Sequence, residues 1–203
     1  EYLNNQILGT NAYFIIISNK ILCIYFLEEN MSEHISKHAE YSVNLPYPEP
    51  MIEMKNIQYA NILLTDYAGA VSEFTAVSLY VYQHFISEGQ FKDYAGLIGG
   101  IAKVEMKHLE LLGETIKLEG VKPMFINRAC PPGSPWSPLY VNYTTAIKEM
   151  LLEDIQSEKK TIKNYKYHLT LIQDKYIKKL LERIILDEEL HIKLFREMYE
   201  KYK

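Results

Sequence analysis

Cysteine is scarce in this chain of 203 residues, which holds only Cys23 and Cys130. Neither belongs to a C-x-x-C pair, so a zinc or iron site built from four thiolates is excluded. Two isolated cysteines give no disulfide framework, and such chains are typical of reducing compartments. We therefore expect a cytoplasmic protein, and the chain is long enough to bury a full hydrophobic core.

Excess positive charge and long apolar runs are missing as well. The formal net charge is −4, which argues against nucleic acid as a main partner. The apolar stretch at residues 12–27 is interrupted by polar residues 18–20, and its pieces are shorter than the roughly 20 residues of a membrane helix. No basic segment with a small-residue cleavage site precedes it, so we expect neither a signal peptide nor a membrane span.

Residues 1–30 are atypical for a folded domain. Because Met31 opens a segment that reads like an ordinary start, residues 1–30 are expected to lie upstream of the native start or to form a poorly specified arm. The alternative is a β-rich segment used in self-association. Residues 31–55 are expected to form an extended arm, since the LPYPEP sequence at 45–50 cannot be helical. Such an arm wraps its own domain or a neighbour.

Proline is absent from residues 56–119 and 142–201, and both stretches show helical periodicity. We predict four helices, at about residues 56–87, 90–119, 142–171 and 174–201. Short connections make the members of each pair antiparallel neighbours. Residues 120–140 are proline-rich and can span about 65 Å when extended, enough to cross the length of a bundle. The expected class is all-α, a four-helix bundle over residues 56–203 with one long crossover between helices 2 and 3.

Glu105 and His108 lie three residues apart and therefore share one face of a helix. The face continues through Ile98, Ile101 and Leu112, so a carboxylate and an imidazole interrupt an apolar stripe. A buried carboxylate is costly unless it is paired or binds a metal. Alone the E-x-x-H pattern is weak, because about 0.6 matches are expected by chance in this composition.

The two halves of the chain repeat the pattern S-E-x-x-x-[VI]-x-x-Y, at residues 72–80 and 157–165. A second E-x-x-H stands at residues 188–191. All these acidic and imidazole groups fall near the middle of their predicted helices, so they can meet at one level of the bundle. Tyr80 and Tyr165 end the two repeats, and they are either donors that orient the carboxylates or plain core residues.

Di-iron and di-manganese carboxylate proteins share one arrangement of ligands: two helices give one glutamate each, and the other two helices give a Glu-x-x-His motif each. Four carboxylates balance the charge of two divalent cations, whereas without cations they repel one another. Oxygen and imidazole ligands suit Fe or Mn. The predicted ligands of two Mn or two Fe ions per chain are Glu73, Glu105, His108, Glu158, Glu188 and His191.

These motifs resemble the ferritin-like superfamily over residues 56–201, and within it rubrerythrin-like and manganese-catalase-like bacterial proteins, including the spore-coat type. The likeness is carried by three segments, residues 72–83, 104–111 and 182–191. It implies a dinuclear metal site and redox chemistry on peroxide or dioxygen. Rubrerythrins have a four-cysteine rubredoxin domain and an extra glutamate where this chain has Thr161, so the likeness to manganese catalases is the better fit.

The resemblance to manganese catalases implies a self-associating oxidoreductase that removes hydrogen peroxide without an external electron donor. It gives Glu188 the role of moving protons beside the metals and leaves the other five residues as direct ligands. One alternative is a di-iron peroxidase or ferroxidase that uses an external donor. Another is a non-enzymatic iron-storage or spore-coat protein. The expected partners are hydrogen peroxide or dioxygen and further copies of this chain, and the residues do not discriminate Mn from Fe.

Overall fold

The computed structural model describes residues 12–17, 20–25, 40–128 and 133–203. The chain separates into two units, Glu1–Lys37 and His38–Lys203. The domain boundaries expected from the sequence stay predictions, and Met31 lies outside the described residues.

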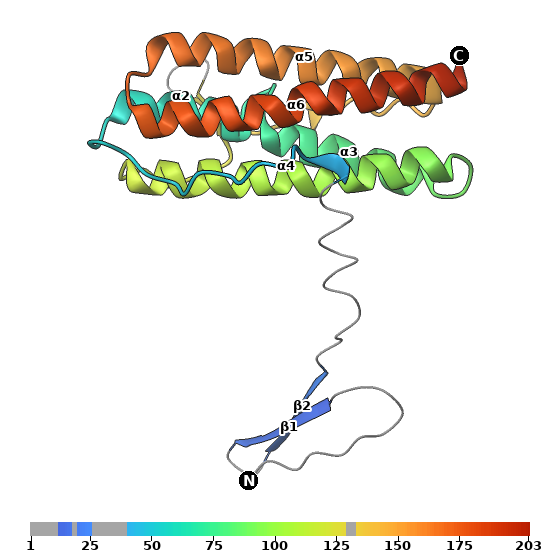
Figure 1. Cartoon of the computed structure of the whole chain (residues 1–203), viewed down its shortest axis with the longest axis horizontal. Coiled ribbons are helices and arrows are strands. Elements are labelled where there is room, and N and C mark those ends of the chain that lie inside the picture. Colours follow the sequence, from blue (N-terminus) through green and yellow to red (C-terminus); the bar gives the residue numbers. More distant parts are fainter. Residues whose placement is uncertain (1–11, 18–19, 26–39, 129–132) are drawn as a thin grey trace. The chain divides into compact units, whose positions relative to one another are not determined.

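The described backbone of the first unit is a β-hairpin (Figure 1). Strand β1 (Ala12–Ile17) pairs antiparallel with strand β2 (Lys20–Tyr25), so that Ala12 lies opposite Tyr25 and Ile17 opposite Lys20. A strand pair is the secondary structure expected if residues 1–30 form a β-rich segment. Self-association through this segment stays a prediction.

In the described part of the second unit, five helices form the bundle shown in Figure 1. They are α2 (Ile57–Ala68), α3 (Glu73–Ser87), α4 (Lys92–Leu118), α5 (Ile147–Leu171) and α6 (Lys175–Tyr202). Helices α2 and α3 follow one another along α4, and α5 packs against α6. Side chains of Asn56 and Asp174 cap α2 and α6 by accepting hydrogen bonds from the first free backbone N–H groups. The predicted all-α four-helix bundle is confirmed, with α2 and α3 together in the place of its first helix.

The prediction of one continuous helix over residues 56–87 is wrong. Gly69 ends α2, where an added Cβ would lie 2.4 Å from the carbonyl oxygen of Thr65. Ser72 then caps α3: its hydroxyl donates to the Gly69 carbonyl at 2.8 Å and accepts from the Thr75 N–H at 3.2 Å. Glu73 is therefore the first residue of a helix rather than near its middle. The positive end of the helix dipole favours a carboxylate at that position.

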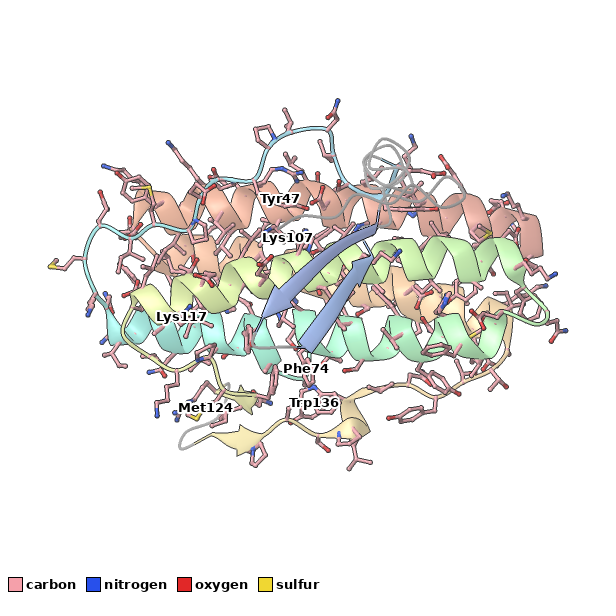
Figure 2. The ribbon with its side chains drawn as sticks, turned by 90° about the horizontal axis from the view of Figure 1, so that it is seen from below. Tyr47, Phe74, Lys107, Lys117, Met124 and Trp136 are labelled. Carbon is pink, nitrogen blue, oxygen red and sulfur yellow. The ribbon has the colours of Figure 1, made fainter. Side chains whose placement is uncertain are left out.

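The crossover between α4 and α5 begins at Gly120, whose φ of 83° ends α4 in the left-handed region that favours glycine. It contains the short antiparallel pair β3 (Ile126–Asn127) and β4 (Ser134–Pro135), followed by the 3-10 turn η1 (Pro138–Tyr140). The indole N–H of Trp136 donates to Thr75 Oγ1 at 2.9 Å. Figure 2 shows Trp136 beside Phe74 on this side of the bundle, and the two rings meet edge to face at 4.8 Å.

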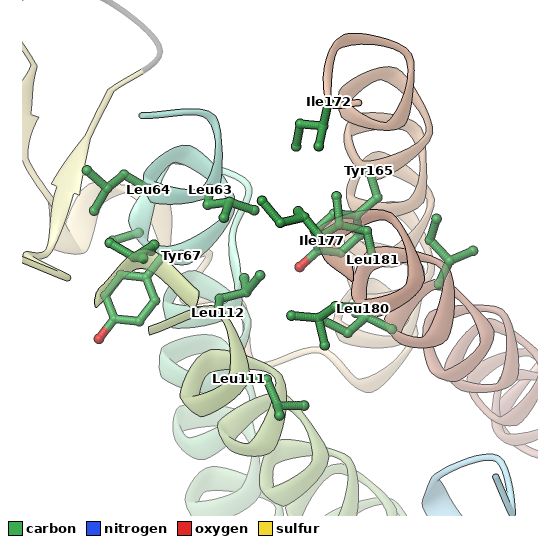
Figure 3. Packing of buried hydrophobic residues seen from close by; sticks show 14 residues of the cluster. Leu63, Leu64, Tyr67, Leu111, Leu112, Tyr165, Ile172, Ile177, Leu180 and Leu181 are labelled. Carbon is green, nitrogen blue, oxygen red and sulfur yellow. The ribbon is translucent and has the colours of Figure 1, made fainter. Parts of the chain in front are cut away.

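The hydrophobic core consists of two clusters of buried side chains. One, shown in Figure 3, joins α2 to α4, α5 and α6 and contains Leu63, Leu112 and Leu181. The other joins α3 to the same three helices and contains Ile101 and Phe195. On α4 the polar side chains Glu105 and His108 fall between the two clusters, so the apolar core is interrupted by a buried polar layer.

Within the expected arm at residues 31–55, Glu40 and Tyr41 are helical, and residues 42–56 contain no helix or strand. This arm segment lies along α6, where the Arg183 guanidinium donates to the carbonyl oxygens of Val43 at 2.8 Å and Leu45 at 2.9 Å. No helix in the described part of the chain is long and apolar enough to cross a membrane.

Candidate metal centre

Six buried side chains meet in the polar layer, and they are the six that the sequence singles out. They form two overlapping groups, in each of which the ligand atoms lie within 4.8 Å of one another. The first group is Glu73, Glu105, His108 and Glu188, and the second is Glu105, Glu158, Glu188 and His191. None of the six is more than 1% exposed. Glu105 and Glu188 belong to both groups, so the arrangement offers two metal positions that share two carboxylates.

The first position is defined by the Nδ1 atom of His108. It lies 3.2 Å from Glu105 Oε2, 3.2 Å from Glu188 Oε1 and 3.6 Å from Glu73 Oε2. Three carboxylates from α3, α4 and α6 thus converge on one imidazole nitrogen. Spacings of 3 to 4 Å between donor atoms fit ligands grouped around one cation.

The second position is defined by the Nδ1 atom of His191. It lies 2.9 Å from Glu105 Oε1, 3.4 Å from Glu188 Oε2 and 3.7 Å from Glu158 Oε1. Each shared carboxylate therefore turns one oxygen toward His108 and the other toward His191. This is the orientation that a carboxylate needs to bridge two metal ions.

The Nε2 atoms of both imidazoles face away from the metal positions and have partners there. His108 Nε2 lies 3.0 Å from Asp187 Oδ2, and His191 Nε2 lies 2.9 Å from the carbonyl oxygen of Tyr41. An acceptor at Nε2 fixes the tautomer in which Nδ1 carries the free lone pair. Both histidines are thus oriented to bind through Nδ1.

The sequence leaves two interpretations of Tyr80 and Tyr165, and the structure supports the hydrogen-bonding one. Tyr80 donates to Glu158 and Tyr165 donates to Glu73, and all four side chains are buried. Each tyrosine stands on the same helix as one outer glutamate and supports the other one. The sequence repeat thus becomes a reciprocal exchange of hydrogen bonds between α3 and α5.

Several buried atoms of the centre make no hydrogen bond with any part of the chain that the structure describes. They are Glu73 Oε2, Glu105 Oε1, both carboxylate oxygens of Glu188 and His191 Nδ1. Buried polar atoms of native proteins are nearly always satisfied by hydrogen bonds or ions. These unsatisfied atoms all face the two metal positions, so the residues fit a pair of bound cations.

The proton balance of the metal-free centre leads to the same interpretation. Burial raises the pKa of Glu73 and Glu158 well above the ordinary glutamate range. Burial on its own also raises the pKa of Glu188, but the neighbouring Glu158 carboxyl and both histidines hold it below its ordinary value. Burial opposes the charge of His191, yet the negative charge of Glu105 raises the pKa of that imidazole to about 10. Without cations, protons therefore take the place of the missing positive charge.

Sequence reasoning missed Asp187, Arg183 and Tyr47, which surround His108 from outside. Asp187 is fully buried, accepts the Val43 N–H at 2.7 Å and pairs with Arg183 Nη1 at 2.8 Å. The Tyr47 hydroxyl donates to Asp187 and lies 3.4 Å from His108 Nε2. The one available signal was Arg183 and Asp187 at a spacing of four residues on a helix face that leads to the centre.

The fold is that of a ferritin-like protein, and its buried cluster of carboxylates and histidines fits a dinuclear site. The family model of the ferritin-like domain matches residues 70–203, so this chain belongs to the ferritin-like family. Among curated proteins, the probable manganese catalase of Clostridium acetobutylicum is 30% identical over 174 residues, with 75% of each chain covered.

Two solved structures share the fold. KatB, a manganese catalase from Anabaena, is similar with a TM-score of 0.66 at 22% sequence identity, over 79% of this chain and 76% of that one. The bacterioferritin of Desulfovibrio desulfuricans, which has a diiron site, is similar with a TM-score of 0.61 at 23% identity, over 71% of this chain and 79% of that one. At these identities the likeness shows the common architecture.

Proposed function

We propose that this protein decomposes hydrogen peroxide to water and oxygen at a dinuclear manganese centre held between α3, α4, α5 and α6. The observation that carries the proposal is the pair of shared carboxylates, Glu105 and Glu188, each directed at both metal positions. The relative from Clostridium acetobutylicum, a probable manganese catalase, supports manganese and peroxide.

In this proposal Glu73 and His108 would hold one metal ion and Glu158 and His191 the other, with Glu105 available to both. A bound metal pair supplies a two-electron redox couple, because one peroxide can reduce it and the next can oxidise it. No external electron donor is then needed.

Glu188 is the proposed proton carrier. Its two oxygens face both metal positions, and neither has a hydrogen-bond partner within the described residues. Its pKa lies below the ordinary range because, against the effect of burial, the neighbouring Glu158 carboxyl and the two histidines favour its charged form. An ionised carboxylate at this place can accept a proton from one peroxide molecule and return it to the oxygen atoms released as water.

The experiment that tests the proposal combines elemental analysis of the natively purified protein with oxygen release on addition of peroxide to the same sample. Two Mn per chain together with oxygen release is the expected result. Two Fe without oxygen release would instead support the di-iron peroxidase or ferroxidase alternative. Iron in a hollow multi-subunit cage, without turnover, would support storage.

The assembly is proposed to be a small homo-oligomer. Large apolar side chains are exposed on the described surface, among them Phe85 at 67% and Leu139 at 90%. Such side chains are often buried when copies of a chain associate. Light scattering after gel filtration measures the mass of the assembly, and a monomer would contradict this part of the proposal.

A further inference from the structure

Helix α4 has three glycines in its N-terminal half, and two of them leave room for a ring from another segment. Inside a helix only proline is less favourable than glycine, so a glycine there usually has a packing reason. An added Cβ at Gly96 would meet nothing within 4 Å, whereas at Gly99 it would lie 2.7 Å from His84 Nδ1. At Gly100 it would lie 2.3 Å from Cε2 of the Tyr41 ring. Gly100 therefore lets the arm approach the backbone of α4.

Tyr41 is also the residue that supports the second metal position from outside. Its carbonyl oxygen lies 2.9 Å from His191 Nε2, and because a carbonyl oxygen only accepts hydrogen bonds, that nitrogen donates. The proton that the imidazole keeps is then the one on Nε2, which leaves Nδ1, 2.9 Å from Glu105 Oε1, for a metal ion. One arm residue thus contacts α4 through its ring and α6 through its main chain.

The Tyr41 ring packs against the core cluster that joins α3 to α4, α5 and α6. The three atoms nearest to an added Cβ at Gly100 all belong to this ring, at 2.3 to 2.7 Å. Nonbonded carbon atoms pack at about 3.5–4.0 Å, so a methyl group at Gly100 displaces the ring. Two residues further on, the Val43 N–H donates to Asp187 Oδ1 at 2.7 Å and the Val43 carbonyl oxygen accepts from Arg183. Because the arm is fixed to α6 at Val43, the displacement falls on Tyr41 itself.

We propose that Gly100 is a positioning residue of the second metal position. By admitting the Tyr41 ring against α4, Gly100 places the Tyr41 carbonyl oxygen where His191 Nε2 can donate to it. The hydrogen bond orients the imidazole, so that Nδ1 faces the carboxylates with which it would share a metal ion. The inference rests on the proposed function only for the presence of the metal pair, and it holds whatever reaction that pair catalyses.

The test compares wild type with Gly100→Ala and, as the matched control, Gly96→Ala. Both variants add one methyl group to α4, but Gly96 is exposed and its added Cβ meets nothing. Competition between the protein and a chelator for Mn²⁺ resolves the two binding steps. Loss of a partner that orients a metal-binding histidine typically weakens metal binding about 10- to 100-fold. We expect Gly100→Ala to weaken one Mn²⁺ about tenfold and not the other, and Gly96→Ala to weaken neither.

A second readout identifies the histidine concerned. Zn²⁺ has a filled d shell, so NMR of the zinc-loaded protein with isotope-labelled histidine shows the ring N–H protons directly. The Nε2 proton of His191 should exchange with water faster in Gly100→Ala than in wild type. The Nε2 proton of His108, whose acceptor is Asp187, should exchange at the wild-type rate. A general loss of stability would accelerate both, which separates positioning from a merely structural role.

Tyr41→Ala tests the same contact from its other side. This variant keeps the main-chain carbonyl oxygen but removes the ring, so it should weaken the same ion. Once the ring is gone, the methyl group of Gly100→Ala no longer meets it, and adding Gly100→Ala to Tyr41→Ala should cause no further loss. Losses that multiply in the double variant would show that the two residues act independently, against the proposal.

The outcomes separate this proposal from the proposed function. Wild-type affinity for both ions in Gly100→Ala overturns the positioning role, and so does equal weakening of both. Should Gly100→Ala not fold, wild-type affinity in Tyr41→Ala overturns it equally. If wild type binds two Mn²⁺ but releases no oxygen from peroxide, the peroxide reaction is wrong, while the affinities of the variants still decide the role of Gly100. A wild type that binds no metal ion overturns both.

Discussion

The two halves of the candidate metal centre use the same ligands but are supported in different ways. His108 is backed by side chains, Asp187 and Tyr47, whereas His191 is backed by the main-chain carbonyl oxygen of Tyr41. A charged acceptor makes an imidazole a more basic ligand than a neutral carbonyl does. We infer that metal binding at the first position depends on the charge of Asp187 and on side chains of the arm. Metal binding at the second position depends mainly on where the backbone places the carbonyl oxygen of Tyr41.

The outer glutamates of the two halves differ as well. Glu73 is the first residue of α3, which begins after a break, while Glu158 lies in the middle of the continuous helix α5. The helix dipole therefore favours the charged form of Glu73 only. Yet both glutamates accept a hydrogen bond from a buried tyrosine of the opposite helix. The two outer glutamates thus receive the same kind of hydrogen bond although they occupy different positions in their helices.

The largest effect is expected where the halves are joined. Glu105→Gln removes a carboxylate that faces both positions, so metal content should fall from two ions to below about one per chain. Glu73→Gln is the matched variant, since it removes a carboxylate from the first position only and should retain about one ion per chain. Elemental analysis after gel filtration measures both, and equal metal content in the two variants would contradict a shared bridge.

The next effect tests the charged support of His108. Asp187→Asn removes the negative charge beside Nε2, and loss of such a partner typically weakens metal binding about 10- to 100-fold. The weaker binding should be confined to one of the two ions, which competition with a chelator resolves as two steps. Asp66→Asn is the control, because Asp66 is also buried and paired with a histidine, His168 at 2.9 Å, outside the ligand set. Equal weakening of both ions would show that the halves are not separately supported.

A smaller effect is expected from the reciprocal tyrosines. Tyr165→Phe leaves Glu73 without its donor, and Tyr80→Phe does the same to Glu158. Each loss removes a hydrogen bond to a charged group, worth about 1.5–3 kcal/mol. Each variant should weaken the ion bound by the opposite helix's glutamate, measured by the same two-step competition. Weakening of the ion on the tyrosine's own helix would disprove the exchange.

The smallest effect on metal binding is expected from Asp154, which is fully buried on α5 outside the ligand set and accepts a hydrogen bond from Tyr94 at 2.7 Å. Burial raises the pKa of this carboxyl to about 8. The folded state then holds the proton more tightly than the unfolded state, so the free energy of unfolding falls as pH rises from about 4 to about 8.

Asp154→Asn keeps an acceptor for Tyr94 and removes the titration. It should bind metal normally and unfold in urea with a weaker pH dependence, with a gain of the order of a few kcal/mol at pH 8. Urea unfolding of metal-free protein at pH 5 and pH 8 measures the difference. The same pH dependence in wild type and variant would show that Asp154 is not protonated in the folded state.

Most of the fold follows from local sequence features. Proline-free periodic stretches give the long helices, and the proline-rich residues 120–140 give the crossover. The break after α2 was not predicted, because a single Gly69 within a helical pattern is commonly tolerated. The hydroxyls of Ser72 and Thr75 donate hydrogen bonds to the carbonyl oxygen of Gly69. These bonds fix the end of α2 and the start of α3 at this glycine.

By itself the sequence determined which six residues are candidates for metal binding, because a spacing of three on a helix and a repeat between halves are local patterns. The tertiary structure alone decided what surrounds them. Tyr47 lies 61 residues from His108 in the chain and 140 from Asp187, and no local pattern relates them. Such partners meet only when the arm packs on α6, since hydrogen bonds and cation–π contacts require atoms within a few ångströms of one another.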